Sequence, residues 1–318
     1  MRDFGGLVTR VPRTVLAPAS VNELATIVTK LASSNTSFVV RGAAHTAGGQ
    51  TVTDGVLVVT RGLRGIVADR PECDELVVEA GALWLDVVRH LSPQGRRPTA
   101  LTDNLRTTIG GTLALGGFGD TSHWHGLQIA SVAALTVITP GGQRVSCGAD
   151  DDLFRYSLAG LGQLGIIAEV TLRTLCRPPL LTARVLTWRS LDTFLGDTHL
   201  LRRYEYLRAR LQFEPEGAAQ VVALAGDFGL TTGAASATPA TRIHRYAVDA
   251  GTPSPRRHRR HCLATLLDRS DQLASLGVRD LSEADAQYAD GLVDGGPRPP
   301  SYVRHLRAVN PGANRTFR

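Results

Sequence analysis

The sequence predicts an α+β fold, and three observations support this prediction. A helical repeat of apolar residues follows a capping motif near the N-terminus, short β-branched runs are separated by turns rich in glycine and proline, and apolar residues make up 43% of the 318-residue chain. This composition is typical of a globular protein, and it excludes a disordered, a collagen-like and a multi-span membrane protein. The length predicts two domains.

The elements of the first domain follow in order along the chain. Ser20 and Glu23 form an S-x-x-E capping box, and the apolar spacing after it predicts a helix through Val21, Leu24, Val28 and Leu31. Apolar runs predict strands at 37–41, 55–60, 75–79, 132–139, 144–146 and 165–175. Helices are predicted at 82–91 and at 153–161, the second capped by the aspartates of 150–152.

A second region begins where Pro178 and Pro179 interrupt the pattern. Here the sequence predicts strands at 181–188, 206–213 and 219–225 and a helix at 191–204, and the periodicity fades after about residue 230. We therefore expect domains at 1–178 and 179–235, followed by an arginine- and proline-rich, poorly ordered tail at 236–318.

The net charge of +6 comes from 35 basic and 29 acidic residues, and most of the excess lies in that tail. The basic run at 256–260 has no aromatic residues between its arginines, so we expect no nucleic-acid partner. The four cysteines lie far apart, which is typical of reduced thiols. With no apolar span and no secretory leader visible, we expect a cytoplasmic protein without a membrane partner.

A loop of small residues at 42–50 is the first of three clusters whose residues could take part in binding or catalysis. It follows a strand, and its backbone N–H groups are open to a pyrophosphate because no bulky side chain intervenes. It matches neither the P-loop nor the Rossmann fingerprint. The alternative is a tight surface turn with a solvent-facing histidine, His45.

The other two clusters lie at 102–112 and 123–126. Asp103 in the first has the alternative role of a turn or helix-cap aspartate. His123 and His125 would share one face of a strand, an arrangement that suggests a metal ligand pair. No third ligand stands at a suitable spacing, so we expect no metal.

Together these clusters resemble a known family. The chain reads R-G-x-x-H-T-x-x-G-Q from Arg41, T-D-x-L-x-x-T-I-G-G-T-L from Thr102, H-G-x-Q-I from His125 and D-L-F…G-L-G-Q-L-G-I-I from Asp152. These ordered motifs resemble the cytokinin dehydrogenase branch of the vanillyl-alcohol-oxidase flavoproteins over about the first 180 residues. The resemblance implies a PCMH-type FAD-binding domain followed by an incomplete α+β substrate domain.

The resemblance assigns roles to individual residues. His45 matches the histidine that links covalently to the flavin 8α-methyl group, and Asp103 matches the aspartate that accepts a proton from the substrate amine. Asp103 is thus the expected catalytic residue and also a flavin contact. The expected cofactor-binding residues are Val40, Gly42, Ala43, Ala44, His45, Thr46, Gln50, Asp103, Thr108, Ala114, Phe118 and Ile167. Ala44 departs from the family's glycine, which narrows the allowed backbone angles.

The implied activity is an FAD-linked oxidase or dehydrogenase that oxidises a C–N bond of a small amine by hydride transfer to flavin N5, with a role in cytokinin metabolism. Its expected partners are a small-molecule substrate and an electron acceptor, either oxygen or a quinone-like molecule. Two alternatives are an FAD-linked oxidase of an alcohol or secondary-metabolite intermediate, and an inactive remnant. Family members continue past residue 318, so the resemblance also implies a C-terminally truncated member.

Overall fold

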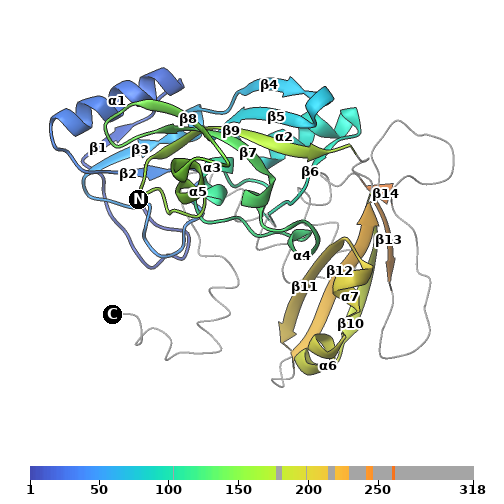
Figure 1. Cartoon of the computed structure of the whole chain (residues 1–318). Coiled ribbons are helices and arrows are strands. Elements are labelled where there is room, and N and C mark those ends of the chain that lie inside the picture. The colour runs from blue at the N-terminus through green and yellow to red at the C-terminus, as the bar shows by residue number, and fades with distance from the viewer. Residues whose placement is uncertain are drawn as a thin grey trace.

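The computed structural model describes residues 1–102, 104–176, 181–197, 199–213, 219–228, 241–245 and 260–261. They form two neighbouring sheets that make up a first domain and a third sheet that stands apart from them (Figure 1). Among the described residues, no helix is both long and apolar enough to cross a membrane.

The smallest sheet is parallel and has the order β1-β3-β2. Its strands are β1 (Thr14–Leu16), β2 (Phe38–Arg41) and β3 (Val56–Val59). Helix α1 (Val21–Ser33) begins as predicted, because the Ser20 hydroxyl accepts a hydrogen bond from the Glu23 N–H at 3.1 Å. The apolar face of α1 buries Val21, Leu24 and Val28 in a core shared with this sheet.

The largest sheet has the order β4-β5-β9-β7-β8, and all its pairs are antiparallel. Its strands are β4 (Ile66–Arg70), β5 (Glu75–Glu79), β7 (Val132–Ile138), β8 (Arg144–Gly148) and β9 (Ile166–Leu175), with β6 (Arg97–Pro98) paired to β9. Its helices are α2 (Trp84–Leu91), α3 (Ile109–Leu113), α4 (Ser122–His125) and α5 (Asp152–Ser157). Trp84 is fully buried at the start of α2, in the main core of the molecule.

The third sheet has the order β11-β12-β10-β13-β14. Its strands are β10 (Leu181–Trp188), β11 (Tyr206–Phe213), β12 (Ala219–Phe228), β13 (Thr241–Arg245) and β14 (Arg260–His261). Helices α6 (Leu191–Gly196) and α7 (Leu200–Arg203) join β10 to β11. This sheet has its own small core around Trp188, Leu200 and Tyr204.

Most predicted strands are confirmed, and three departures have local causes. The predicted helix at 191–204 is two short helices, interrupted at Asp197. The predicted helix at 153–161 ends at Ser157, because Ala159 and Leu161 adopt left-handed backbone angles. The sequence analysis did not identify β1, β4 and β6, which are short or carry charged residues.

The expected domain boundary at 235 falls inside the third sheet, because β13 pairs in parallel with β10. Apart from β13 and β14, the segment 236–318 that we expected to be poorly ordered lies outside the described residues.

Candidate functional site

The small-residue loop at 42–50 follows β2, which ends at Arg41, and the N-terminal segment contacts it. The buried Arg41 guanidinium donates to the carbonyl oxygens of Thr51 at 3.2 Å and Arg2 at 3.1 Å. The Phe4 N–H donates to the Thr46 carbonyl at 2.9 Å. The loop is therefore fixed by contacts on two sides and is not a simple solvent-facing turn.

His45 lies at the centre of this loop and is largely enclosed. Its ring packs against Phe4 with centroids 5.6 Å apart, and the Asn104 side-chain amide donates to Nδ1 at 3.4 Å. Burial, with a smaller contribution from the Arg61 charge, lowers the pKa of His45 to about 4. The imidazole is consequently neutral at physiological pH.

The first two clusters meet at Gly42 and Thr108. A Cβ atom on Gly42 would lie 2.2 Å from Thr108 Oγ1, so only glycine fits here without movement. Thr108 is 2% exposed and stands at the N-cap of α3. The sequence motifs at 42–50 and 102–112, which are about sixty residues apart, are therefore in direct contact.

Ala44 adopts a left-handed conformation with φ +66°. This region disfavours residues with a Cβ and is one that glycine enters freely. The sequence analysis expected alanine at position 44 to narrow the allowed backbone angles of the loop. The left-handed angles found here are ones at which a Cβ has that effect.

A third segment runs beside the end of α3. The N–H groups of Ala159 and Leu161 donate to the carbonyl oxygens of Leu113 and Ala114, both at 2.9 Å. Ile167 is buried in β9, and its carbonyl lies 3.6 Å from the Cβ position of Gly110. The expected residues Thr108, Ala114 and Ile167 are therefore grouped around α3.

The remaining expected site residues are more scattered. Val40 packs into the core beneath α1, and Gln50 is exposed, with its side-chain oxygen accepting from the Gly48 N–H at 3.1 Å. Phe118 is 77% exposed on the segment between α3 and α4. Asp103 lies outside the described residues.

The two histidines of the third cluster are on a helix, so the strand geometry considered for them is wrong. In α4, His123 Nε2 donates to the Tyr204 carbonyl at 2.8 Å, and His125 Nε2 donates to Glu205 at 2.6 Å. Both residues therefore hold the third sheet in place. Within the described part of the chain, no group of three or more histidine, cysteine or acidic side chains is arranged to bind a metal ion.

The polar groups between the two domains were not predicted from the sequence. Glu205 is buried and pairs with both Arg97 and His125, and the Arg97 guanidinium lies 3.9 Å from the centroid of the Phe228 ring. Burial alone would raise the pKa of Glu205, but the contacts with His125 and Arg97 outweigh it and lower the pKa. This carboxylate lies just before β11, in the segment RYEYL at 203–207.

A second buried carboxyl group, Asp120, lies 3.2 Å from the Arg208 guanidinium of β11. Burial raises its pKa to about 7, and the hydrogen bond from Tyr206 and the charge of Arg210 limit that rise. Only the structure reveals this residue, because Asp120 and β11 are distant in sequence.

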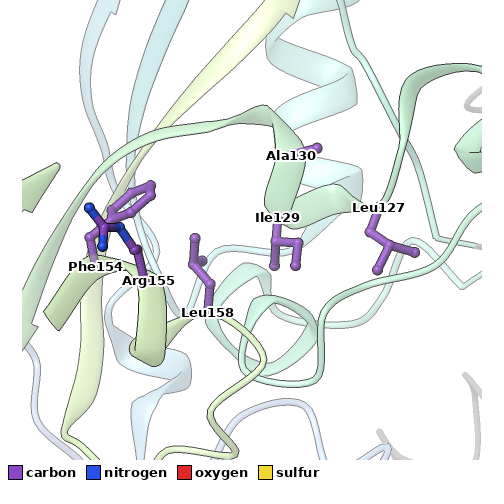
Figure 2. Close-up of a pocket in the computed structure, with 6 residues that line it drawn as sticks. All are labelled: Leu127, Ile129, Ala130, Phe154, Arg155 and Leu158. Atoms are coloured by element: carbon purple, nitrogen blue, oxygen red, sulfur yellow. The ribbon is translucent and has the colours of Figure 1, made fainter. Parts of the chain in front are cut away.

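A shallow apolar hollow of about 470 Å³ lies on another part of the first domain (Figure 2). It is lined by Leu127, Ile129, Ala130, Phe154, Arg155 and Leu158. Arg155 donates to the carbonyl oxygens of Ala149 and Asp150 and pairs with Asp152, so its charge is used within its own loop. The hollow therefore offers mainly apolar contacts.

Comparison with known proteins finds one matching family and several similar oxidoreductases. Residues 12–148 match the family described as FAD binding domain. The chain is 33% identical over 220 residues to an uncharacterized oxidoreductase, ORF5 of the fasciation locus, from Rhodococcoides fascians, which covers 68% of this chain and 50% of that protein. It is 38% identical over 210 residues to cytokinin dehydrogenase 7 of Oryza sativa subsp. japonica, covering 63% of this chain and 40% of the relative.

A third relative is cytokinin dehydrogenase 3 of Arabidopsis thaliana, which is 36% identical over 180 residues, or 54% of this chain and 34% of the relative. The chain thus spans half or less of the length of these relatives. The matched family region contains both the His45 loop and the Thr108 segment. Residues 12–148 therefore form an FAD-binding domain, and over about two thirds of its length the chain is similar to an oxidoreductase and to cytokinin dehydrogenases.

Proposed function

We propose that this protein is a cytokinin dehydrogenase-like FAD-linked oxidoreductase that carries covalently attached FAD and oxidises a C–N bond of a small amine. The observation that carries the proposal is the enclosed, neutral His45 beside Asn104, in a loop closed onto Thr108. An imidazole must be neutral to act as a nucleophile, and this one is kept neutral by its surroundings.

The residues around His45 fit an FAD molecule. Gly42 has no space for a Cβ, and the loop at 42–46 presents backbone groups with only small side chains around His45. Backbone N–H groups in such loops bind phosphate oxygens. Gly42, Ala43, Ala44 and Thr46 would hold the pyrophosphate, with Thr108 closing the other side. Bound FAD would supply the hydride acceptor for the oxidation.

We assign the proton-accepting role to Asp103, which the sequence places between two described neighbours. Thr102 pairs with Gly119, and Asn104 contacts His45. A carboxylate in this segment would take the proton from the substrate nitrogen, which makes the adjacent C–H bond a better hydride donor. Water would then hydrolyse the imine product, and oxygen or a quinone-like molecule would serve as the final electron acceptor.

The experiment is an absorption spectrum of the purified protein before and after acid precipitation. We expect flavin absorbance to stay in the pellet of the unsubstituted protein and to move to the supernatant in His45→Ala. His199→Ala removes an exposed histidine from the second domain and is the matched control. Flavin that stays in the His45→Ala pellet would contradict the assignment.

The amine substrate is tested by anaerobic bleaching of the flavin absorbance with N6-isopentenyladenine. We expect bleaching in the unsubstituted protein and at least about hundredfold slower bleaching in Asp103→Asn, because general-base groups contribute roughly 10²–10⁴-fold to rates. Equal bleaching rates would remove Asp103 as the base, and flavin-loaded protein that no amine bleaches would contradict the proposed reaction.

A further inference from the structure

Residues 2–9 form a short loop, which we call the N-terminal loop, beside the end of β2 (Figure 1). Arg2 pairs with Thr9 as an isolated antiparallel bridge, and the Asp3 N–H donates to the Val8 carbonyl at 3.0 Å. The Asp3 side chain, which is 2% exposed, accepts a hydrogen bond from the Val8 N–H at 3.0 Å. The N-terminal loop is therefore held in a defined shape by its own contacts.

The N-terminal loop packs against the small-residue loop at 42–50. The Phe4 N–H donates to the Thr46 carbonyl at 2.9 Å. A Cβ atom on Gly5 would lie 2.6 Å from the Ala47 carbonyl oxygen, closer than Cβ atoms come to other atoms, so the two backbones touch at this point. Phe4 is thus fixed against the residues that directly follow the histidine of the loop.

The Phe4 ring contacts the ring of His45. The two ring centroids are 5.6 Å apart, and the ring planes are inclined by 42°. Aromatic pairs at about this separation attract each other when they are tilted or offset. In addition, the Asn104 amide donates to His45 Nδ1 at 3.4 Å, and the Asn104 side-chain oxygen accepts from the Arg106 N–H at 2.9 Å. Two contacts from distant parts of the chain therefore set the orientation of the imidazole.

The same surroundings determine the charge of His45. Burial is the main reason that its pKa falls from the ordinary value of 6.5 to about 4, and the charge of Arg61 acts in the same direction. The Phe4 ring is apolar and half-buried against the imidazole, so it excludes water from part of that ring. Loss of the Phe4 ring would admit water, stabilise the imidazolium ion and raise the pKa of His45.

We propose that Phe4 is a positioning residue for His45, which orients the imidazole and shields it from water so that it can bond to the flavin 8α-carbon. The proposal rests on the proposed function, because it names a residue on which covalent FAD attachment through His45 depends. Phe4 acts through His45 and needs no contact with the substrate.

The attachment step oxidises the 8α-carbon of the flavin. The new bond joins one imidazole nitrogen to that carbon and replaces one C–H bond and one N–H bond. Two protons go to solvent, and the two electrons reduce oxygen to hydrogen peroxide. Phe4 contributes no atom to this step. It holds the nucleophile in place, and a small displacement of a reacting group slows a reaction by a large factor.

Attachment is measured by adding FAD to flavin-free protein and following the flavin that stays in the pellet after acid precipitation. We expect attachment to be about tenfold or more slower in Phe4→Ala than in the unsubstituted protein. Phe4→Tyr keeps an aromatic ring and should restore a rate close to the original. Phe194→Ala removes another half-buried ring, which packs against Trp188 in the third sheet, and should have no effect.

Titration of the His45 ring protons by NMR in the flavin-free protein distinguishes a positioning role from a general loss of structure. In the unsubstituted protein, His45 should remain neutral at every pH above about 5. In Phe4→Ala it should take up a proton between about pH 7 and pH 5, because its pKa rises toward 6.5. Phe4→Leu keeps the apolar bulk, so it replaces Phe4→Ala if that variant does not fold, and it should slow attachment several-fold.

Three results would overturn the proposal. They are attachment in both Phe4→Ala and Phe4→Leu at the unsubstituted rate, a His45 in Phe4→Ala that still does not titrate above about pH 5, and an equal loss of attachment in Phe194→Ala.

The proposed function fails in different ways. No acid-stable flavin in the unsubstituted protein would contradict covalent attachment itself, and the role of Phe4 with it. Attached flavin that no amine bleaches would contradict the proposed reaction and leave the role of Phe4 standing. Attachment that is equally fast with and without the Phe4 ring would contradict the role of Phe4 alone.

Discussion

Thr108 Oγ1 lies 2.2 Å from the position where a Cβ atom on residue 42 would be, so Gly42 and Thr108 make a contact that no larger residue at position 42 can reproduce. This contact joins the loop after β2 to the N-cap of α3. The arrangement of the loop at 42–50 therefore depends on the lack of a side chain at Gly42 and on the buried hydroxyl of Thr108.

We predict that Gly42→Ala destabilises the protein by about 1–3 kcal/mol, because overpacking a closed site forces its neighbours to shift. Adding Thr108→Ala removes the hydroxyl and should recover part of that loss. Chemical denaturation of the two single variants and the double variant measures the coupling. Additive losses would show that the two residues do not constrain each other.

The left-handed conformation of Ala44 predicts a stabilising substitution. Ala44→Gly should raise the free energy of unfolding by about 0.5–1 kcal/mol, because the strain of a Cβ at φ +66° exceeds the added freedom of glycine in the unfolded chain. Ala43→Gly is the control, since Ala43 is not among the residues with positive φ. An Ala44→Gly variant no more stable than Ala43→Gly would contradict the prediction.

The low pKa of His45 predicts a loss of stability in acid. The folded-state pKa of about 4 lies below the ordinary value of 6.5, so the unfolded state binds more protons between these values and stability falls as the pH falls through this window. We expect His45→Gln to remove about 2–3 kcal/mol of the difference in unfolding free energy between pH 7 and pH 4. Parallel pH profiles of the two flavin-free proteins would refute it.

The low pKa of Asp69 predicts a second pH range, below that of His45, in which the protein loses stability. Partial burial alone would raise its pKa, but hydrogen bonds from Arg96, His90 and Gln94 outweigh it and lower the pKa to about 2. The stabilisation is therefore present above pH 4 and is lost as the pH falls toward 2. Asp69→Asn should cost about 1–2 kcal/mol at pH 7, reduced by solvent screening, and nearly nothing at pH 2. Unfolding by urea at both pH values measures this difference.

The ion pairs of Glu205 are expected to contribute much of the stability of the interface between the two domains. Glu205→Ala leaves the buried Arg97 and the partly buried His125 without their carboxylate, which should cost about 3–5 kcal/mol. Because the loss is confined to the interface, thermal unfolding should separate into two transitions. Glu169→Ala, which breaks the more exposed pair with Arg144, should keep one transition and lose under about 1 kcal/mol.

Sequence reasoning identified the elements that depend on local patterns. The capping box of α1, the strands β5, β10 and β11, and the small-residue loop after β2 are determined by residues close together in the chain. Motif order also grouped the loop at 42–50 with Thr108, although the contact between Gly42 and Thr108 is long-range.

The rest of the site could not be predicted because it depends on how distant segments meet. The pairs Asp120–Arg208 and Arg97–Glu205 join residues about ninety or more positions apart, and the sequence does not indicate either pairing. His123 and His125 suggested a metal because their spacing was considered on a strand. On α4 both rings instead contact the segment at 204–205.

The Leu207 N–H donates a hydrogen bond to the Asp120 carbonyl at 2.8 Å, and this bond affects the tendency of the protein to aggregate in concentrated solution. Strand β11 is the edge of its sheet, and a bare edge offers unpaired N–H and C=O groups to the strands of other molecules. The first domain occupies one of these donors and covers the start of the edge. Substitutions that separate the domains would therefore expose a surface for intermolecular strand pairing, and such variants should precipitate before they unfold.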